Sequence, residues 1–233
     1  MKLAGIQKNS FNDYPGKIAA VLFTPGCNLD CFYCHNRQLL QPSAQNNALH
    51  MEGILGFLQK RKAFLDGVVI TGGEPTLQQD LEECIQRIRD IGYPVKLDTN
   101  GTRPQILQKL LQEKLLAYIA MDIKAPLSRY EEICRTQVHL SDIQESIQLI
   151  QESGIEYEFR TTCIPQLNRK DIQEIVSLIP GAKRYALQQY RRPQVDIGPE
   201  WFKAQPHPAA FFTDVAEQLQ GMVQHVELRG VDG

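Results

Sequence analysis

The chain has 233 residues, of which 42% are hydrophobic and 22% are charged, a composition typical of a soluble globular protein with a sizeable core. Its formal net charge of −2 excludes a broad basic surface, so we expect no nucleic-acid partner. The longest apolar run, 115–121, is too short to span a membrane, and the first residues lack the apolar core of a signal peptide. We therefore expect a cytoplasmic protein without a membrane partner, in a compartment where thiols stay reduced.

The first predicted strand covers residues 17–24 and follows a strong turn signal, Asp13-Tyr14-Pro15-Gly16. The segment directly after this strand, Pro25–Asn36, is called the cysteine loop below. It contains three of the six cysteines of the chain: Cys27, Cys31 and Cys34. The sequence thus places three thiols at the carboxyl end of a buried strand, where α/β proteins usually carry their chemistry.

Three closely spaced thiolates suit a soft metal or an iron–sulfur cluster. A structural zinc site normally has four ligands from paired motifs, but no second motif follows, and His35 is adjacent to Cys34 and poorly placed to share its metal. A cluster of four irons held by three cysteines leaves one iron open, which implies catalysis. We therefore predict an iron–sulfur cluster, with zinc and unliganded thiols as the alternatives.

Predicted helices and strands alternate after the cysteine loop. Helices are predicted at 51–66, 78–91, 104–115, 141–153, 168–179 and 209–219. Strands are predicted at 68–71, 95–97, 117–121, 157–163 and 184–188, with a last one at 223–228. The resulting six βα repeats predict a parallel sheet and, because a full barrel has eight repeats, a partial (βα)6 barrel of the TIM type. We expect one domain over 1–233, with a core of about 14–190 and a C-terminal extension of about 191–233.

Polar residues gather at the ends of these predicted strands. The segments concerned are Cys27–Cys34, Gly72–Pro75, Asp98–Gly101, Asp122–Lys124, Arg160–Thr162 and Gln188–Tyr190. Because the reactive groups of barrel folds come from the carboxyl ends of strands, we expect these segments to line one site.

The motif Gly72-Gly73-Glu74-Pro75 has a functional and a structural interpretation. The two glycines would let a ligand approach the backbone closely, and Glu74 would accept hydrogen bonds from a substrate ammonium. Alternatively, the motif is only a tight turn between a strand and a helix.

The charged residues at the next strand ends also have two interpretations. Asp98, Thr99 and Asp122 are suited to bind a ribose or a hard cation, or else the aspartates only cap helices and turns. Lys124 and Arg160 are suited to neutralise a substrate carboxylate, or else are ordinary salt-bridged bases.

Three cysteines lie outside the cysteine loop, in unrelated segments: Cys84, Cys134 and Cys163. We predict that they are core residues, because a free cysteine packs as a small hydrophobic side chain. Trp201, the only tryptophan, lies in a proline-rich connection and either docks a partner or packs in the core.

Two motifs on consecutive strand ends resemble the radical S-adenosylmethionine superfamily. They are Cys27-x-x-x-Cys31-x-x-Cys34, with the aromatic Tyr33 before the third cysteine, and Gly72-Gly73-Glu74-Pro75. Within this superfamily the chain resembles the glycyl-radical-enzyme activating proteins, most closely those that act on anaerobic ribonucleoside-triphosphate reductase. The supporting segments are 13–16, 34–36, 97–101 and 122–124, and the resemblance covers about residues 5–190.

This resemblance implies one 4Fe–4S cluster and S-adenosylmethionine as cofactors. The three cysteines of the cysteine loop would hold the cluster, and the open iron would take the amino and carboxylate groups of S-adenosylmethionine. Reductive cleavage would give a 5′-deoxyadenosyl radical, which would remove a hydrogen atom from a glycine of a partner glycyl radical enzyme. The electron would come from a low-potential donor of the flavodoxin or ferredoxin type. No cysteine lies between Cys34 and Gly72, so no insertion with further clusters is expected.

The resemblance also implies roles for single residues. The methionine amino group would be held by Glu74 with the backbone of Gly72 and Gly73, and its carboxylate would face Lys124 or Arg160. The residues expected to bind ribose, or a monovalent or other hard cation, are Asp98, Thr99, Asn100 and Asp122. The groups expected to flank adenine are Tyr33 and 188–190. Two alternatives remain: a different glycyl radical enzyme or a small molecule as substrate, and a metal-binding or electron-transfer protein without catalysis.

Overall fold

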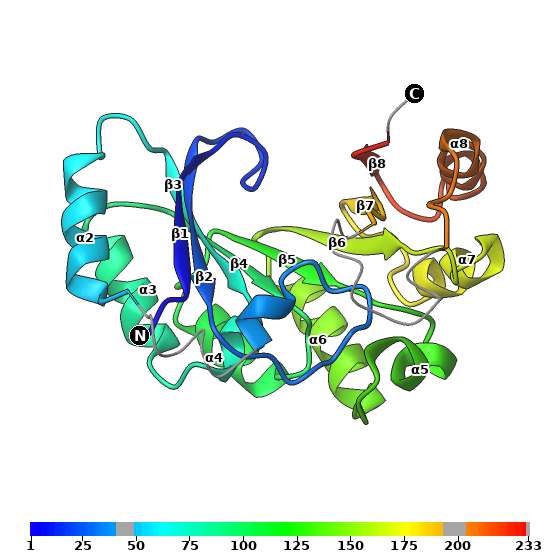
Figure 1. Cartoon of the computed structure of the whole chain (residues 1–233), viewed down its shortest axis with the longest axis horizontal. Helices are drawn as coiled ribbons and strands as arrows, with labels where there is room; N and C mark the ends of the chain where they lie inside the picture. Colours follow the sequence, from blue (N-terminus) through cyan, green and yellow to red (C-terminus); the bar gives the residue numbers. More distant parts are fainter. Residues whose placement is uncertain (41–48, 193–203, 232–233) are drawn as a thin grey trace.

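The computed structural model describes residues 1–40, 49–192 and 204–231. Eight strands in these ranges form one sheet, in the same order in space as in sequence (Figure 1). They are β1 (Gly5–Ser10), β2 (Ala19–Thr24), β3 (Gly67–Gly72), β4 (Val95–Thr99), β5 (Tyr118–Asp122), β6 (Glu156–Cys163), β7 (Tyr185–Gln189) and β8 (Val226–Arg229). Strands β2 to β8 run parallel, and β1 pairs antiparallel with β2.

Seven α-helices in the described ranges connect the strands. They are α2 (Met51–Lys60), α3 (Leu81–Asp90), α4 (Pro104–Gln112), α5 (Tyr130–Cys134), α6 (Leu140–Glu152), α7 (Arg169–Ser177) and α8 (Ala209–Gln218). Each of the strands β2 to β7 is followed by a helix, so the predicted partial (βα)6 barrel with a parallel sheet is confirmed. None of the helices in the described ranges is long and apolar enough to cross a membrane.

Two features of the first half differ from the sequence prediction. Strand β1 was not expected, because most of its side chains are polar, and Gln7, Lys8 and Asn9 are exposed at the sheet edge. Helix α2 ends at Lys60, whereas the sequence predicts it to residue 66. The chain leaves the helix early because Asp66 joins the sheet: its N–H donates to the Ile18 carbonyl at 2.7 Å, and its side chain accepts from the Ile18 N–H at 3.0 Å. Phe64, which lies in the part of the predicted helix that does not form, is 45% exposed.

The main core lies between the sheet and its helices. Alternate residues of the strands point outward into this layer, and they are apolar and fully buried: Leu22, Ile70, Leu97, Ile119, Phe159 and Leu187. Cys84, Cys134 and Cys163 belong to the same core, as predicted. Burial of this continuous apolar layer is the main force that holds the barrel together.

A second, small apolar cluster lies inside the barrel, at the amino ends of the strands. It is built by Tyr14, Ala19, Val21, Val69, Tyr118 and Ala120. Tyr14 comes from the predicted turn, in which Gly16 has a φ of +70° and the Lys17 N–H donates to the Tyr14 carbonyl at 3.1 Å. The Tyr14 and Tyr118 rings lie 5.8 Å apart, so the turn closes this end of the barrel.

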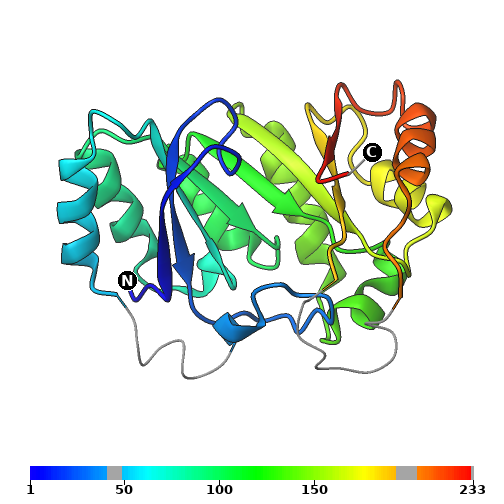
Figure 2. The ribbon, with the colours of Figure 1, turned by 45° about the horizontal axis from the view of Figure 1, so that its top comes forward.

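The cysteine loop lies at the opposite end of the strands. Figure 2 shows the strand arrows pointing toward the edge along which this loop runs, in blue. Strands β7 and β8 extend the same parallel sheet, and α8 packs beside α7 (Figure 1). Trp201 and most of the proline-rich connection lie outside the described residues, and the boundary between a core and a C-terminal extension remains a prediction.

Candidate active site

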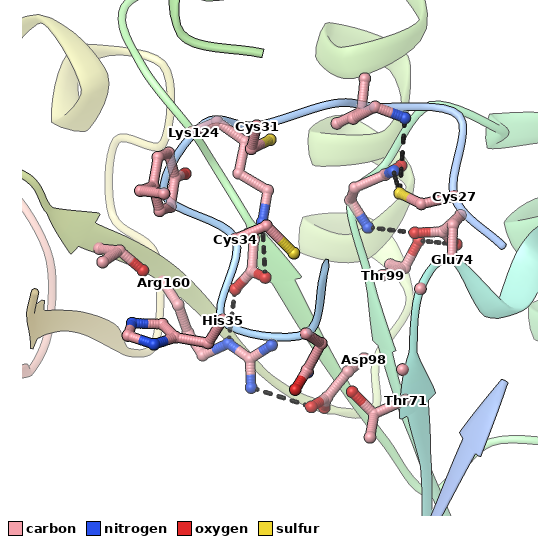
Figure 3. A pocket seen from close by; sticks show the side chains of 18 of the residues that line it. Cys27, Cys31, Cys34, His35, Thr71, Glu74, Asp98, Thr99, Lys124 and Arg160 are labelled. Carbon is pink, nitrogen blue, oxygen red and sulfur yellow. Dashed lines mark hydrogen bonds and ion pairs between the residues drawn. The ribbon is translucent and has the colours of Figure 1, made fainter. Parts of the chain in front are cut away.

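A cavity of about 320 Å³ opens at the carboxyl ends of the strands (Figure 3). Its wall is formed by the cysteine loop and by the ends of β3, β4, β5, β6 and β7. The residues predicted to hold the cluster and S-adenosylmethionine line it: Cys27, Cys31, Tyr33, Cys34, Gly72, Gly73, Glu74, Asp98, Thr99, Asn100, Asp122, Lys124 and Arg160. Of the segment 188–190, expected at adenine, Gln188 and Gln189 line the cavity, whereas Tyr190 is not among the lining residues. Residues far apart in the chain therefore meet in one site, as the positions of the strand ends predicted.

The glycine pair brings the end of β3 against the cysteine loop. A Cβ at Gly73 would lie 1.8 Å from the carbonyl oxygen of Gly26, and one at Gly72 would lie 2.3 Å from the backbone nitrogen of Thr24. The Gly73 N–H donates to the Thr24 carbonyl at 2.9 Å, and the Glu74 N–H donates to the Gly26 carbonyl at 2.8 Å. The close approach that requires these glycines is thus made first by the chain's own backbone.

Glu74 is fully buried and joins β3 to β4. Its Oε1 accepts from the Thr76 N–H at 3.0 Å, the Thr76 hydroxyl at 2.5 Å and the Thr99 hydroxyl at 2.8 Å. Its Oε2 accepts one hydrogen bond within the described residues, from the Asn100 N–H at 2.7 Å. Burial raises the pKa of Glu74, and the hydrogen bonds from Thr76, Asn100 and Thr99 oppose that rise.

Asn100 fixes the cysteine loop from β4. Its side-chain amide donates to the Asn28 Oδ1 at 3.0 Å and to the Cys27 Sγ at 3.8 Å. Thr102 completes the arrangement, because its hydroxyl accepts from the Asn28 amide at 2.8 Å and donates to the Asn100 Oδ1 at 2.7 Å. The Asn100 side chain, for which the sequence suggested ribose or a cation, is therefore engaged with the loop that carries the cysteines.

A chain of ion pairs runs across the strands at the bottom of the cavity. The Lys96 Nζ lies 2.6 Å from Asp98, and the Arg160 guanidinium bridges Asp98 at 3.1 Å and Asp122 at 2.7 Å (Figure 3). The Lys124 Nζ lies 2.9 Å from Asp122. Charges of both signs alternate along this row, so each carboxylate is neutralised by two cationic side chains of the protein.

These contacts set the protonation of the two aspartates. Burial alone would raise the pKa of Asp98, but the charges of Arg160 and Lys96 outweigh it and hold the pKa below its usual value. Burial also acts against ionisation of Asp122, and Arg160 with Lys124 holds that pKa well below its usual range. Both carboxylates are ionised and already paired, so nothing in the structure supports the expected cation beside them.

The three cysteines of the loop have different surroundings. Cys27 and Cys34 are partly exposed and Cys31 is buried, and Figure 3 shows Cys27 beside Glu74, across from the other two. Burial raises the pKa of Cys27 to about 11, whereas a hydrogen bond with the Cys134 side chain lowers the pKa of Cys31 to about 7. Cys134 also binds the loop through its backbone, because the Asp30 N–H donates to its carbonyl at 3.0 Å.

Comparison with known proteins identifies the family. The family model of the radical SAM superfamily matches residues 21–179. The chain belongs to the radical SAM superfamily. The protein MJ1227 of Methanocaldococcus jannaschii, named as a candidate glycyl-radical enzyme activating enzyme, is 33% identical over 239 residues, 99% of this chain and 97% of that protein. A GTP 3′,8-cyclase of Aquifex aeolicus is 28% identical over 174 residues, 69% of this chain and 52% of that protein.

Solved structures share the radical SAM fold. Streptococcus suis SuiB bound to S-adenosylmethionine superposes with a TM-score of 0.68 at 16% identity, over 91% of this chain and 52% of SuiB. The polyhistidine-tagged protein anSMEcpe with bound AdoMet gives a TM-score of 0.59 at 15% identity, over 84% of this chain and 56% of that chain. The chain spans about half the length of each structure, and at these identities the likeness shows the fold alone.

Membership of the radical SAM superfamily implies a 4Fe–4S cluster and S-adenosylmethionine as cofactors. Two observations test whether the chain fits them. The three thiols of the cysteine loop line one cavity, and thiolates are the ligands that hold iron–sulfur clusters. The hydroxyl of Tyr33 is buried at the cavity without a hydrogen-bond partner among the described residues, which is costly unless a bound group supplies one. The residues present fit a bound cluster.

Sequence reasoning missed two charged residues of this radical SAM barrel, Lys96 and Glu158. Both are buried and point into the barrel interior, next to Asp98 and Arg160. The signal was present in the strands themselves, because β4 and β6 carry charges at alternate positions and alternate residues share one face. The sequence prediction used only the residues at the strand ends.

Proposed function

We propose that the protein is a radical SAM activating enzyme that installs a glycyl radical on a partner enzyme, with anaerobic ribonucleoside-triphosphate reductase as the target. The observation that carries this proposal is the relationship to MJ1227, which extends over nearly the whole length of both chains. The resemblance noted in the sequence, including Cys34-His35-Asn36 and Asp122-Ile123-Lys124, supports the choice of the reductase.

In this proposal Cys27, Cys31 and Cys34 hold one 4Fe–4S cluster, because all three line the same cavity. The cluster, when bound, supplies the electron that cleaves the sulfonium of S-adenosylmethionine. Asn100 and the backbone ladder between Gly73 and the cysteine loop keep Cys27 in place. An electron donor of the flavodoxin or ferredoxin type would deliver its electron at this loop.

The free hydrogen-bonding capacity of the cavity suits the amino-acid part of S-adenosylmethionine. The Oε2 of Glu74 has one bond and can accept another, from the methionine ammonium. Within the described residues the Lys124 Nζ makes one hydrogen bond and the Arg160 Nη2 makes none, so both can donate to the methionine carboxylate. Asp98, Thr99 and Asp122 are left for the ribose, and Tyr33, Gln188 and Gln189 for adenine.

A small-molecule substrate is the second candidate, because the match to a GTP 3′,8-cyclase covers 69% of this chain. The charged residues that line the cavity do not separate the two candidates, because the proposal assigns them to S-adenosylmethionine. The products of the reaction separate them.

The test is anaerobic reconstitution of the cluster, followed by addition of dithionite and S-adenosylmethionine. We expect 5′-deoxyadenosine to form, and its absence would exclude the enzyme. Addition of anaerobic ribonucleoside-triphosphate reductase should then give the glycyl radical doublet in the EPR spectrum. Cleavage without a doublet would point to another glycyl radical enzyme, and consumption of GTP in its place would support the second candidate.

A further inference from the structure

The C-terminal strand β8 lies beyond the region that the family model matches, which ends at residue 179. It nevertheless joins the barrel as the neighbour of β7, with Arg229 opposite Gln188 in the register. Gln188 lines the cavity. The end of β8 therefore lies beside the site, although nothing in the superfamily match assigns it a role.

Arg229 reaches from β8 to the buried carboxylate of Glu158 on β6. Its Nη1 lies 3.0 Å from the Glu158 Oε1, and its Nη2 lies 2.6 Å from the Oε2, a bidentate pair that occupies both oxygens. The Tyr118 hydroxyl adds a donor to the Oε2 at 3.2 Å. Glu158 has no exposed surface, so these contacts replace all of its hydration.

Glu158 also competes for two cationic side chains of the ion-pair row. Its Oε1 lies 3.9 Å from the Lys96 Nζ and 3.9 Å from the Arg160 Nη1. The same two cations lie closer to Asp98, at 2.6 Å and 3.1 Å. Because attraction between charges in a protein interior is strong, an unpaired Glu158 would draw Lys96 and Arg160 away from Asp98.

We propose that Arg229 is a positioning residue for the S-adenosylmethionine site. By neutralising Glu158 it leaves Lys96 and Arg160 on Asp98, and it thereby holds Asp98 and Arg160 in the places where they meet the bound molecule. The C-terminal strand β8 thus contributes Arg229, which pairs with Glu158 next to the ion-pair row. This inference rests on the proposed placement of S-adenosylmethionine beside Asp98 and Arg160, and it is independent of which enzyme is activated.

The experiment compares Arg229→Met with the double variant Arg229→Met/Glu158→Gln. After anaerobic reconstitution, the dissociation constant of S-adenosylmethionine is measured by calorimetry, together with the iron content. Arg229→Met should keep its iron and bind S-adenosylmethionine about tenfold more weakly or worse, because it leaves a buried charge unpaired. The double variant, which no longer buries that charge, should recover to within about threefold of the wild type.

Two further variants separate positioning from general stability. Arg184→Met removes a cation that pairs with Glu227 of β8 but does not contact Glu158, and its affinity should stay within about twofold of the wild type. Glu158→Gln alone should also bind normally, because Arg229 keeps its pair with Glu227 at 2.9 Å. If Arg229→Met does not fold, the double variant and Glu158→Gln still decide the matter.

Normal affinity in a folded Arg229→Met protein, or a weak double variant that retains its iron, would overturn the positioning role. A loss in Arg184→Met as large as in Arg229→Met would do the same, because it would indicate a general effect of β8. Failure of the proposed function would look different: wild-type protein with a full cluster that binds no S-adenosylmethionine removes both proposals. Normal binding without a glycyl radical removes only the proposed target.

Discussion

The two faces of the sheet differ in chemistry although the same strands build both. In β6, Phe159 points outward and is fully buried under helices, whereas its neighbours Glu158 and Arg160 point into the barrel and carry charge. In β4, Leu97 likewise points outward into the core, and Lys96 points into the barrel and carries charge. The outer face stabilises the fold by burying apolar area, and the inner face holds charges whose burial stabilises little. Because the apolar outer face is enough to hold the fold together, we expect the charged inner face to serve binding.

The interior itself is divided along the barrel axis. At the amino ends of the strands it is closed by an apolar cluster around Tyr14 and Tyr118. Toward the carboxyl ends the ion-pair row begins, and beyond it lies the cavity. The cavity is thus confined to one half of the interior, and we expect substitutions on the two faces to affect different measurements.

The largest effect on stability is expected on the outer face. Phe159→Ala should lower the free energy of unfolding by about 3–5 kcal/mol, because it leaves a cavity in the main core. Urea unfolding of the protein measures this loss. The fraction that remains folded should bind S-adenosylmethionine normally, and a stable variant with weak binding would contradict the division between the faces.

A large effect on function is expected at the rim of the inner face. In Gly73→Ala the new Cβ would meet the Gly26 carbonyl oxygen at 1.8 Å, so the cysteine loop must move. We expect the rate of S-adenosylmethionine cleavage, followed as 5′-deoxyadenosine, to fall by about a hundredfold or more. The matched control is Gly53→Ala in α2, where a Cβ would meet no atom within 4 Å. Equal activity of the two variants would show that the close approach does not matter.

The ion-pair row predicts a pH dependence. The pKa of Asp122 is lower in the folded than in the unfolded protein, so its stabilisation is fully present above the unfolded value of about 4 and is lost as the pH falls below it. Asp122→Asn should therefore cost about 2 kcal/mol at neutral pH and progressively less in acid. Urea unfolding of both proteins across the acid range measures this, and a difference that does not change with pH would contradict the assignment.

The smallest effect is expected for charges on the helices. Arg87 of α3 pairs with Glu52 of α2, but the Glu52 side chain is 78% exposed. Arg87→Gln should therefore change the free energy of unfolding much less than Asp122→Asn does. Thermal unfolding measures this change. A loss of stability as large as that of Asp122→Asn would show that buried and exposed ion pairs contribute equally.

The sequence predicted the parts of this molecule that are local in the chain. The cysteine loop, the glycine motif and the aspartates were found because each follows a recognisable strand, and the parallel topology brings those strand ends together. The contact between Arg229 and Glu158 was not predicted, because it depends on the register of β6, β7 and β8. Strand β1 was missed because edge strands carry little apolar pattern. The engagement of Asn100 with the loop depends on side-chain geometry, which no spacing encodes.

The cysteine loop is anchored at two separate places. Near Cys27 it continues the hydrogen-bond ladder between β2 and β3, and Asn100 of the segment after β4 joins it there. Near Cys31 it is tied to the end of α5, which follows β5, through the bond from Asp30 to Cys134. Any widening of the barrel between β4 and β5 would therefore change the separation of the two cysteines. The distance between the two thiols therefore depends on the separation of β4 and β5. A rigid group bound to both thiols would fix that separation.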